Sequence, residues 1–366
     1  MNKRILYAAS TIGHINDFHL EIIDKLRLTG AHVFVMARGE GADFDIPFEK
    51  RLLSWKNLKC LFLIRKILKK EEFHAVVLNT SLAAFLVRVA MPKRLKKTTK
   101  VVNFVHGYLF HASSRFFRRV LFLLCEKLVA RKTDVVITMN SYDYDMARRH
   151  KLSMGDVILS RGVGVRHRRV ITPPEKIRRE IFGVGRRVIA FVGELSVRKN
   201  QEFLIRCLPL IRRSLCDVRL CLVGDGAERQ GLEALAGRLS LGDEVIFTGY
   251  RKDAMDFIRA CDVYVTASHS EGLPINLIEA MSLGKTVVAS AIKGHTDLIR
   301  DGVSGYLCDV GDEEGFSDTV CRALGGALLP PERVREAVHC YDRESAAIDI
   351  TDILLGKIGV SDVGDY

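Results

Sequence analysis

Residues 263–281 read VYVTASHSEGLPINLIEAM, and this stretch predicts a strand, a loop and a helix in that order. Val263–Thr266 consists of residue types that favour strands. Gly272 frees the backbone of the loop, and Pro274 suits the first turn of a helix that Gly284 would end. A buried strand that leads directly into a helix is the repeating unit of a parallel α/β sheet. The stretch therefore predicts that fold class.

The same alternation runs through the rest of the chain. Apolar runs separated by amphipathic segments predict parallel strands joined by right-handed crossovers. In the first half we expect strands at Ile5–Ala9, His32–Ala37, Ala75–Asn79, Val101–His106, Asp134–Met139 and Val157–Leu159, and helices near 17–29, 58–71, 81–91, 114–132 and 141–150. In the second half we expect strands at Val188–Val192, Val218–Val223, Glu244–Thr248, Val263–Thr266, Thr286–Ser290 and Gly305–Cys308, and helices near 198–214, 227–240, 253–260, 275–283, 295–300, 313–325 and 343–355.

The length and the turn signals predict two domains. A chain of 366 residues suits two domains of ordinary size. Gly162–Val165 and Pro173-Pro174 mark a turn-rich boundary. We expect two tandem Rossmann-like domains with parallel sheets facing a central cleft. Their predicted bounds are 1–168 for the first domain, 175–345 for the second domain, and 346–366 for a helix and tail that could pack back on the first domain.

Composition and charge indicate the cellular compartment and the kind of binding partner. The nine cysteines include no C-x-x-C pair, which favours a reducing compartment. No window has the ~18 apolar residues of a transmembrane helix, and we interpret residues 1–10 as a first strand, not a signal peptide. The net charge of +12 divides into +17 for residues 1–168 and −5 for the remainder. This asymmetry indicates that the first half faces an anionic partner.

Two charged motifs follow predicted strands of the second half. Arg198 and Lys199 lie after Val188–Val192, where an ion pair with a diphosphate would be favourable, although a solvated basic turn is the alternative. Glu271 and Glu279 straddle a predicted helix start, so that both carboxylates can face the hydroxyls of one ligand. The alternative is a carboxylate at a helix N-terminus and a surface glutamate. The Gly224-Asp225-Gly226 motif does not complete a dinucleotide fingerprint.

Two segments of the first half are also candidates for ligand binding. The loop Thr11–Asp17 contains Gly13, which would let the backbone approach a ligand, or it is an ordinary turn between a strand and a helix. His106 closes a strand and would face the ligand-binding edge of the sheet, or it caps the strand structurally.

Together these motifs resemble the family 4 retaining glycosyltransferases of the GT-B fold. The run Glu271–Glu279 matches their E-x7-E pattern, and the resemblance covers nearly the whole chain. The supporting motifs of the second half are Phe191-Val192-Gly193, Arg198-Lys199-Asn200, Leu222–Gly226, Val245–Tyr250 and Cys261-Asp262-Val263. The first half is similar to capsule and exopolysaccharide transferases in Gly13–Asn16, His106-Gly107, Asp134–Thr138 and Gly162–Val165.

The resemblance implies a role for each matching residue. Arg198 and Lys199 would bind the donor diphosphate, Glu271 would contact the transferred sugar, and His106 would hydrogen-bond to it. Glu279 would hold the ribose, and Tyr250 and Arg251 would border the nucleobase. The other donor-binding residues would be Gly13, Gly193, Asn200, Gly224, Gly272 and Leu273, and His14 would face the acceptor. The resemblance also implies same-face attack with retention, without a dedicated nucleophile.

Basic tracts in the first half suggest contact with a membrane. Arg115, Phe116, Phe117, Arg118 and Arg119 open a predicted helix rich in aromatic and aliphatic residues. Such a mixture suits an anionic bilayer, and the alternative is a core-facing helix with a solvated basic edge. No nucleic-acid recognition motif accompanies the charge.

We therefore predict a retaining hexosyltransferase of surface-glycan biosynthesis. It would move a sugar from a nucleotide-sugar, expected to be a UDP-sugar, to a saccharide or polyprenyl-diphosphate-linked acceptor. No D-x-D pair stands in a suitable loop, so neither a metal nor a cofactor is expected. We expect a cytoplasmic protein at the inner face of the cell membrane. The alternatives are a nucleotide-sugar epimerase of the same fold and a non-catalytic nucleotide-sugar-binding subunit.

Overall fold

A computed structural model describes residues 3–49, 54–110, 116–166 and 169–356. The chain forms two compact units, residues 1–164 with 341–366 and residues 165–340. The backbone therefore passes between the units twice, once after Gly164 and once before Tyr341. The first passage lies a few residues ahead of the boundary that the turn signals predict, and the second lies ahead of residue 346.

The first unit contains seven parallel strands. Their order in the sheet is β3-β2-β1-β4-β5-β6-β7. The strands are β1 (Arg4–Thr11), β2 (His32–Arg38), β3 (Phe44–Asp45), β4 (Ala75–Leu78), β5 (Lys100–Phe104), β6 (Val135–Thr138) and β7 (Asp156–Leu159). The order reverses beside β1, whose neighbours are β2 and β4. In a sheet of this kind the crevice beside the reversal is the usual place for a ligand.

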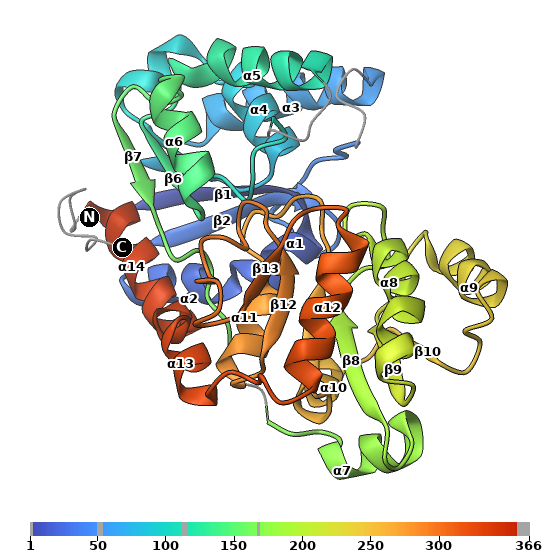
Figure 1. The fold of residues 1–366 in the computed structure, drawn as a ribbon. Helices are drawn as coiled ribbons and strands as arrows, with labels where there is room; N and C mark the ends of the chain where they lie inside the picture. The colour runs from blue at the N-terminus through green and yellow to red at the C-terminus, as the bar shows by residue number, and fades with distance from the viewer. Residues whose placement is uncertain (1–2, 50–53, 111–115, 167–168, 357–366) are drawn as a thin grey trace. The chain divides into compact units, whose positions relative to one another are not determined.

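Helices cover both faces of this sheet. They are α1 (Ile12–Phe18), α2 (Leu20–Leu28), α3 (Trp55–Lys70), α4 (Ser81–Ala90), η1 (Lys93–Lys97), α5 (Phe116–Ala130), α6 (Ser141–Arg149) and α14 (Arg343–Leu355). Figure 1 shows α3, α4 and α5 on one face, and α14 packs against α2 on the other. Leu6 and Ala8 of β1 point into the core beneath α3 and α4.

The second unit contains six parallel strands in the order β10-β9-β8-β11-β12-β13. They are β8 (Arg187–Val192), β9 (Val218–Val223), β10 (Val245–Gly249), β11 (Val263–Thr266), β12 (Val287–Ser290) and β13 (Tyr306–Cys308). The helices are α7 (Pro174–Ile177), η2 (Arg178–Phe182), α8 (Gln201–Ser214), α9 (Arg229–Arg238), α10 (Ala254–Ala260), α11 (Ile275–Ser282), α12 (Glu313–Leu324) and α13 (Pro331–Glu336), and η3 (His339–Tyr341) leads back to the first unit.

The strands of the second unit are buried on both faces. Ile189 and Phe191 of β8 pack in the core beneath α8, α9 and α12. Val188 and Ala190 of the same strand pack toward α7 and α10. Alternate residues of one strand thus serve two cores, which is why this strand reads as a continuous apolar run.

Two local predictions were wrong. The segment Thr11–Asp17 is not a loop, because Thr11 caps a helix that begins at Ile12, its side chain accepting from the His14 N–H. The segment 295–300 is not a helix but a series of turns, in which the N–H groups of Leu298 and Ile299 both donate to the His295 carbonyl. Within the described part of the chain, no helix is both long enough and apolar enough to cross a bilayer.

Candidate functional site

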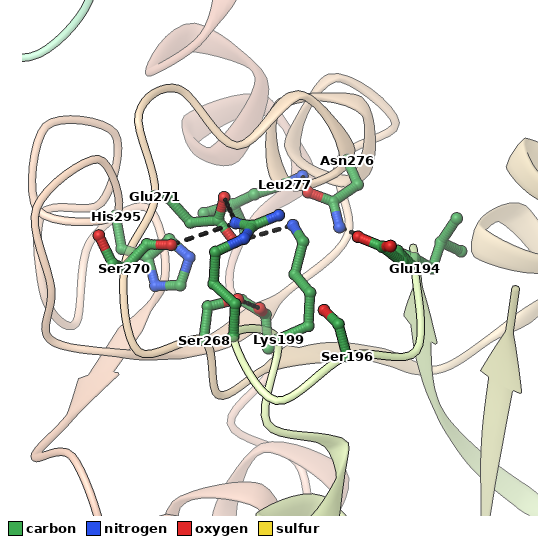
Figure 2. A network of polar contacts seen from close by, with 12 residues as sticks. Glu194, Ser196, Lys199, Ser268, Ser270, Glu271, Asn276, Leu277 and His295 are labelled. Carbon is green, nitrogen blue, oxygen red and sulfur yellow. Dashed lines mark hydrogen bonds and ion pairs between the residues drawn. The ribbon is translucent and has the colours of Figure 1, made fainter. Parts of the chain in front are cut away.

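Two cations and one carboxylate meet at the carboxyl ends of β8 and β11. Arg198 Nη1 donates to Glu271 Oε2 at 2.7 Å, and Lys199 Nζ lies 2.8 Å from Glu271 Oε1. Figure 2 shows the Lys199 and Glu271 side chains reaching toward each other from the two loops. The sequence predicted that all three residues face the donor, and the structure brings them together as one ion cluster.

The members of this cluster differ in their exposure. The side chains of Glu271 and Lys199 are 7% and 11% exposed, whereas that of Arg198 is 49% exposed. Burial alone would raise the pKa of Glu271, but the charges of Lys199 and Arg198 outweigh it and hold the pKa below its usual value. Glu271 therefore stays ionised, and Arg198 is the cation that is free to turn toward a ligand in solvent.

Backbone contacts hold the two loops together. The His269 N–H donates to the Arg198 carbonyl at 2.9 Å, and Asn200 Nδ2 donates to the Ala267 carbonyl at 3.2 Å. Asn200 has the left-handed backbone conformation, with a φ of 55°. The helix α8 consequently begins at Gln201 and not at residue 198, so the two cations lie in the preceding turn and not in the helix.

The second predicted carboxylate lies in α11. Glu279 and Glu271 are both near the buried hydroxyl of Tyr264, where they add to the effect of burial in raising its pKa. At the start of the same helix, Asn276 Nδ2 donates to the Val192 carbonyl and fixes α11 against the end of β8 (Figure 2). The charges of Glu279 and Glu271 thus act on the same buried hydroxyl.

His295 is a site residue that the sequence did not single out. Its side chain is fully buried beside the Glu271 loop (Figure 2), and its Nδ1 lies 2.8 Å from the Ser290 carbonyl oxygen. Burial lowers its pKa to about 4, with Glu271 opposing the shift. Since Nδ1 donates to a carbonyl, Nε2 is an acceptor, and it has no hydrogen-bond partner among the described residues. No sequence pattern pointed to His295; in the structure, a Cβ added to the preceding Gly294 would meet the Gly272 oxygen at 2.9 Å, so the two loops pack closely here.

The other residues of the second unit that are predicted to bind the sugar donor differ in their burial and in their contacts. A Cβ on Gly224 would lie 1.9 Å from the oxygen of Gly193, so this glycine is required by the packing of the two loops. Tyr250 is 78% exposed. Arg251 is held by Asp253 through contacts of 2.7 and 2.8 Å and is already neutralised. Leu273 is buried directly before α11.

In the first unit, three histidines gather at the ends of β1 and β5. His106 Nε2 lies 2.8 Å from His19 Nε2, and the His14 ring packs edge-on against His106 with centroids 4.7 Å apart. Burial lowers the pKa of His14 to about 4 and holds those of His19 and His106 well below their usual value. All three imidazoles are therefore neutral at physiological pH.

His19 was missed because its partner lies 87 residues away in the chain. The buried Tyr7 hydroxyl approaches His19 Nδ1 at 3.4 Å, so the contacts run from Tyr7 through His19 to His106. In the neutral pair, one Nε2 donates and the other accepts. His19 thereby couples the tautomer of His106 to its own and holds the orientation of the His106 ring.

The three histidines also form a group that could share a metal ion, since their ring nitrogens lie within 4.8 Å of one another. Two nitrogens bound to one tetrahedral metal would be about 3.4 Å apart. The 2.8 Å between His19 and His106 is shorter than that and fits a hydrogen bond. Gly13 lies beside this group in the first turn of α1, where an added Cβ would meet nothing within 4 Å.

The α5 helix exposes apolar and basic side chains. Phe116 and Phe117 are 72% and 85% exposed, and Arg118 and Arg119 are exposed as well. This part of the helix is therefore not core-facing, contrary to the alternative that the sequence left open. Arg115 lies outside the described residues.

Comparison with known proteins finds a matching family for each half of the chain. Residues 174–337 match the family described as glycosyl transferases group 1, and residues 20–162 match the glycosyl transferase 4-like domain. A putative glycosyltransferase of Bacillus subtilis, EpsD, is 29% identical over 89% of this chain and 91% of its own length. A UDP-Gal:α-D-GlcNAc-diphosphoundecaprenol α-1,3-galactosyltransferase of Escherichia coli is 26% identical over 78% of this chain and 76% of its own length.

Solved structures share the fold over nearly the whole chain. A sucrose-phosphate synthase of Thermosynechococcus elongatus superposes with a TM-score of 0.80 at 20% identity, over 97% of this chain and 99% of its own. HepE of Anabaena, solved in complex with UDP and glucose, superposes with a TM-score of 0.77 at 20% identity, over 98% of this chain and 100% of its own. The chain therefore belongs to the glycosyltransferases of the GT-B type, with a 4-like domain in its first half and a group 1 domain in its second.

Proposed function

We propose that the protein is a retaining, metal-independent hexosyltransferase that moves a sugar from a UDP-sugar to a lipid-linked acceptor. The observation that carries this proposal is the cluster of Arg198, Lys199 and Glu271, which has a net charge of +1 where the predicted diphosphate would bind. Departure of a nucleoside diphosphate develops negative charge, and preformed cations stabilise that charge most effectively where water is excluded.

The exposure of each group suggests its task. The half-exposed Arg198 would leave Glu271 and pair with the diphosphate, since its fork geometry suits phosphate oxygens. The buried Lys199 would hold Glu271 in place, and Glu271 would contact the transferred sugar. The Gly272 and Leu273 N–H groups before α11 would cap a phosphate, Glu279 would hold the ribose hydroxyls, and the exposed Tyr250 would border the nucleobase.

On the acceptor side, His106 would hydrogen-bond to the transferring sugar. Because His106 is neutral and held by His19, it offers one fixed hydrogen-bonding nitrogen. The acceptor hydroxyl would attack the anomeric carbon on the face that the diphosphate leaves, and the departing phosphate oxygen would take the hydroxyl proton. One glycosidic bond then forms as one sugar–phosphate bond breaks, with retention.

The relatives' printed names support the choice of substrates. The Escherichia coli relative uses UDP-Gal and acts on a diphosphoundecaprenol-linked sugar, and the HepE structures contain UDP, glucose or UDP-glucose. A lipid-linked acceptor lies at a membrane, and the exposed phenylalanines and arginines of α5 suit the anionic inner face of the cell membrane. We therefore place the protein in the cytoplasm, peripherally bound to that face.

The test combines a donor panel with an acceptor panel. Purified protein would receive UDP-, GDP- and ADP-sugars in turn, with and without a polyprenyl-diphosphate-linked sugar and with EDTA throughout. We expect one UDP-sugar to be consumed only with the lipid-linked acceptor, and NMR of the product to show the donor's anomeric configuration. Inversion or a requirement for a divalent metal would contradict those parts of the proposal, and consumption without acceptor would favour an epimerase.

Membrane binding is tested separately with two variants of matched exposure. Phe117 on α5 is 85% exposed and Leu28 on α2 is 87% exposed, and the two helices cover opposite faces of the sheet. Phe117→Asp should reduce co-sedimentation with phosphatidylglycerol vesicles, whereas Leu28→Asp should not. Equal loss in both variants would remove α5 as the docking face.

A further inference from the structure

A cavity lies in the first unit between α4, α5 and the segment that follows β5. Its volume is about 400 Å³, within the range of roughly 300–1,000 Å³ that ligand pockets have. Its apolar walls are Leu82 and Phe85 of α4, Leu109 and Phe110 after β5, and Phe122 of α5. Nothing assigned so far to donor binding or sugar transfer uses this cavity.

Two charged residues line the cavity, and one of them is already neutralised. Arg88 Nη2 donates to both carboxylate oxygens of Glu126, at 2.9 and 3.0 Å, and both residues are buried. Arg118, in contrast, is exposed, and no described carboxylate lies within ion-pair distance of it. The cavity therefore combines apolar walls with one available positive charge.

The inner end of the cavity adjoins His106. A smaller hollow lined by Asn79, Asn103 and His106 shares three lining residues with the large cavity, namely Ser81, Tyr108 and Glu126. A ligand in the apolar cavity would thus lie next to the hollow that contains the imidazole we assign to the sugar-transfer step.

The α5 helix, which forms one wall of the cavity, also has an exposed apolar surface. Besides Phe116 and Phe117, α5 exposes Leu121, Leu124 and Leu128 at 54%, 57% and 77%. One helix therefore lines the cavity with Phe122 and Cys125 and also presents apolar side chains to solvent. A patch of this kind on a soluble protein marks an interaction surface.

We propose that this cavity binds the isoprenoid chain of the acceptor next to its diphosphate, with Arg118 pairing with the diphosphate. The inference rests on the proposed function and names the acceptor class for it. An isoprenyl diphosphate is apolar along its chain and anionic at one end, which matches phenylalanine and leucine walls beside one unpaired arginine. A free saccharide would need polar side chains along the walls. The apolar side chains that the same helix exposes suit a bilayer, in which the remainder of a long chain would stay.

Cys125 allows occupancy to be measured without turnover. This free cysteine lines the cavity, and the exposed Cys216 of the second unit is an internal reference. The full-length protein would be alkylated with N-ethylmaleimide, and both sites followed by mass spectrometry. Farnesyl diphosphate at ten times its dissociation constant should slow alkylation of Cys125 by roughly tenfold and leave the rate at Cys216 unchanged.

Other probes distinguish the source of any protection. Inorganic diphosphate and phosphatidylglycerol vesicles should each protect Cys125 much less than farnesyl diphosphate does. Equal protection by inorganic diphosphate would show an anion site alone, and equal protection by vesicles would show coverage by bilayer lipid. Either result, or no protection at all, overturns the proposal.

A variant links the cavity to catalysis. Leu109→Asp places a charge on a half-exposed wall position, and Leu28→Asp on α2 is a surface control outside the cavity. Leu109→Asp should abolish protection and raise the KM for the lipid-linked acceptor at least tenfold, with donor affinity unchanged. If wild-type protein uses the lipid-linked acceptor and Leu109→Asp uses it equally well, the cavity proposal fails and the transferase proposal stands. If wild-type protein transfers to no acceptor, the proposed function itself fails.

Discussion

Replacing each cation of the Glu271 cluster separately should uncouple stability from activity. Lys199→Met leaves a 7% exposed carboxylate whose remaining cationic partner, Arg198, is half-exposed. Breaking a buried pair in this way costs about 3 kcal/mol. For a unit of this size that corresponds to a decrease of roughly 6–12 °C in melting temperature. Arg198→Met removes a solvent-screened pair, whose contribution is about 1 kcal/mol or less.

The effect on catalysis should be similar for both variants. Arg198→Met loses the cation that pairs with the developing diphosphate, and Lys199→Met loses the cation that holds Glu271 against the transferred sugar, so kcat should fall by roughly 10²–10³-fold in either case. Melting temperature would be followed by circular dichroism, and kcat by release of the nucleoside diphosphate. Arg198→Met is the informative variant, because it should be inactive and stable at the same time.

A double variant controls for general disruption of the site. Lys199→Met/Glu271→Gln has no unpaired buried charge, so it should regain most of the stability that Lys199→Met loses. It should remain inactive. An Arg198→Met variant with normal kcat would refute the assignment of the cations to the leaving group. A Lys199→Met variant with normal melting temperature would refute the energetic argument.

Four further predictions follow from single residues. Gly224→Ala should destabilise the second unit by roughly 1–3 kcal/mol, measured by urea unfolding, because its Cβ would meet a backbone oxygen at 1.9 Å. Gly13→Ala should instead stabilise the first unit by roughly 0.5–1 kcal/mol in the same assay, since Gly13 lies in a helix with open space around it. The same variant should raise the donor KM if the donor phosphates approach the Gly13 backbone. The Glu271 carboxylate has a folded-state pKa below the usual 4.5, so its contribution to stability is complete above pH 4.5 and is lost as the pH falls through the folded-state pKa. The free energies of unfolding of wild type and Glu271→Gln, measured between pH 3 and pH 7, should therefore converge at the acid end. His19→Leu should lower kcat by roughly tenfold and change its pH profile, whereas His19→Gln, which keeps a hydrogen-bonding group, should retain most activity; equal losses would indicate a packing role only.

Most strands were predictable because burial on both faces leaves a direct signal. Val218–Val223 and Val263–Thr266 have the predicted bounds, since each is a run of apolar and β-branched residues between turn signals. Helix starts were harder to predict because single side-chain caps decide them. Ser54 accepts from the Lys56 N–H and starts α3 at Trp55, three residues before the predicted bound. Thr11 caps α1 in the same way, whereas Asn200 starts α8 through its left-handed backbone and not through a side-chain cap.

The candidate site was predictable as a set of residues but not as a set of contacts. Glu271 and Arg198 were recognised because both follow buried strands in a family-like pattern. Their ion pair joins residues 73 positions apart, and periodicity carries no information about such a pair. His19 and His295 gave no pattern at all, since each is defined by a buried contact that only the packed sheet creates.

The assignment of α14 to the first unit has a consequence for biogenesis. Its buried residues, among them Ala347, Ile350 and Leu354, pack over α2, and a Cβ on Gly164 would meet the Arg343 backbone at 2.5 Å. A ribosome must make residues 165–340 between these two parts, and about 180 residues take roughly 10–35 s to translate. During that interval the nascent N-terminal sheet lacks a covering helix, while the inserted unit is contiguous and can fold as it emerges. The second half of the chain should therefore reach its native state first, and the N-terminal half is the part that needs chaperone protection during synthesis.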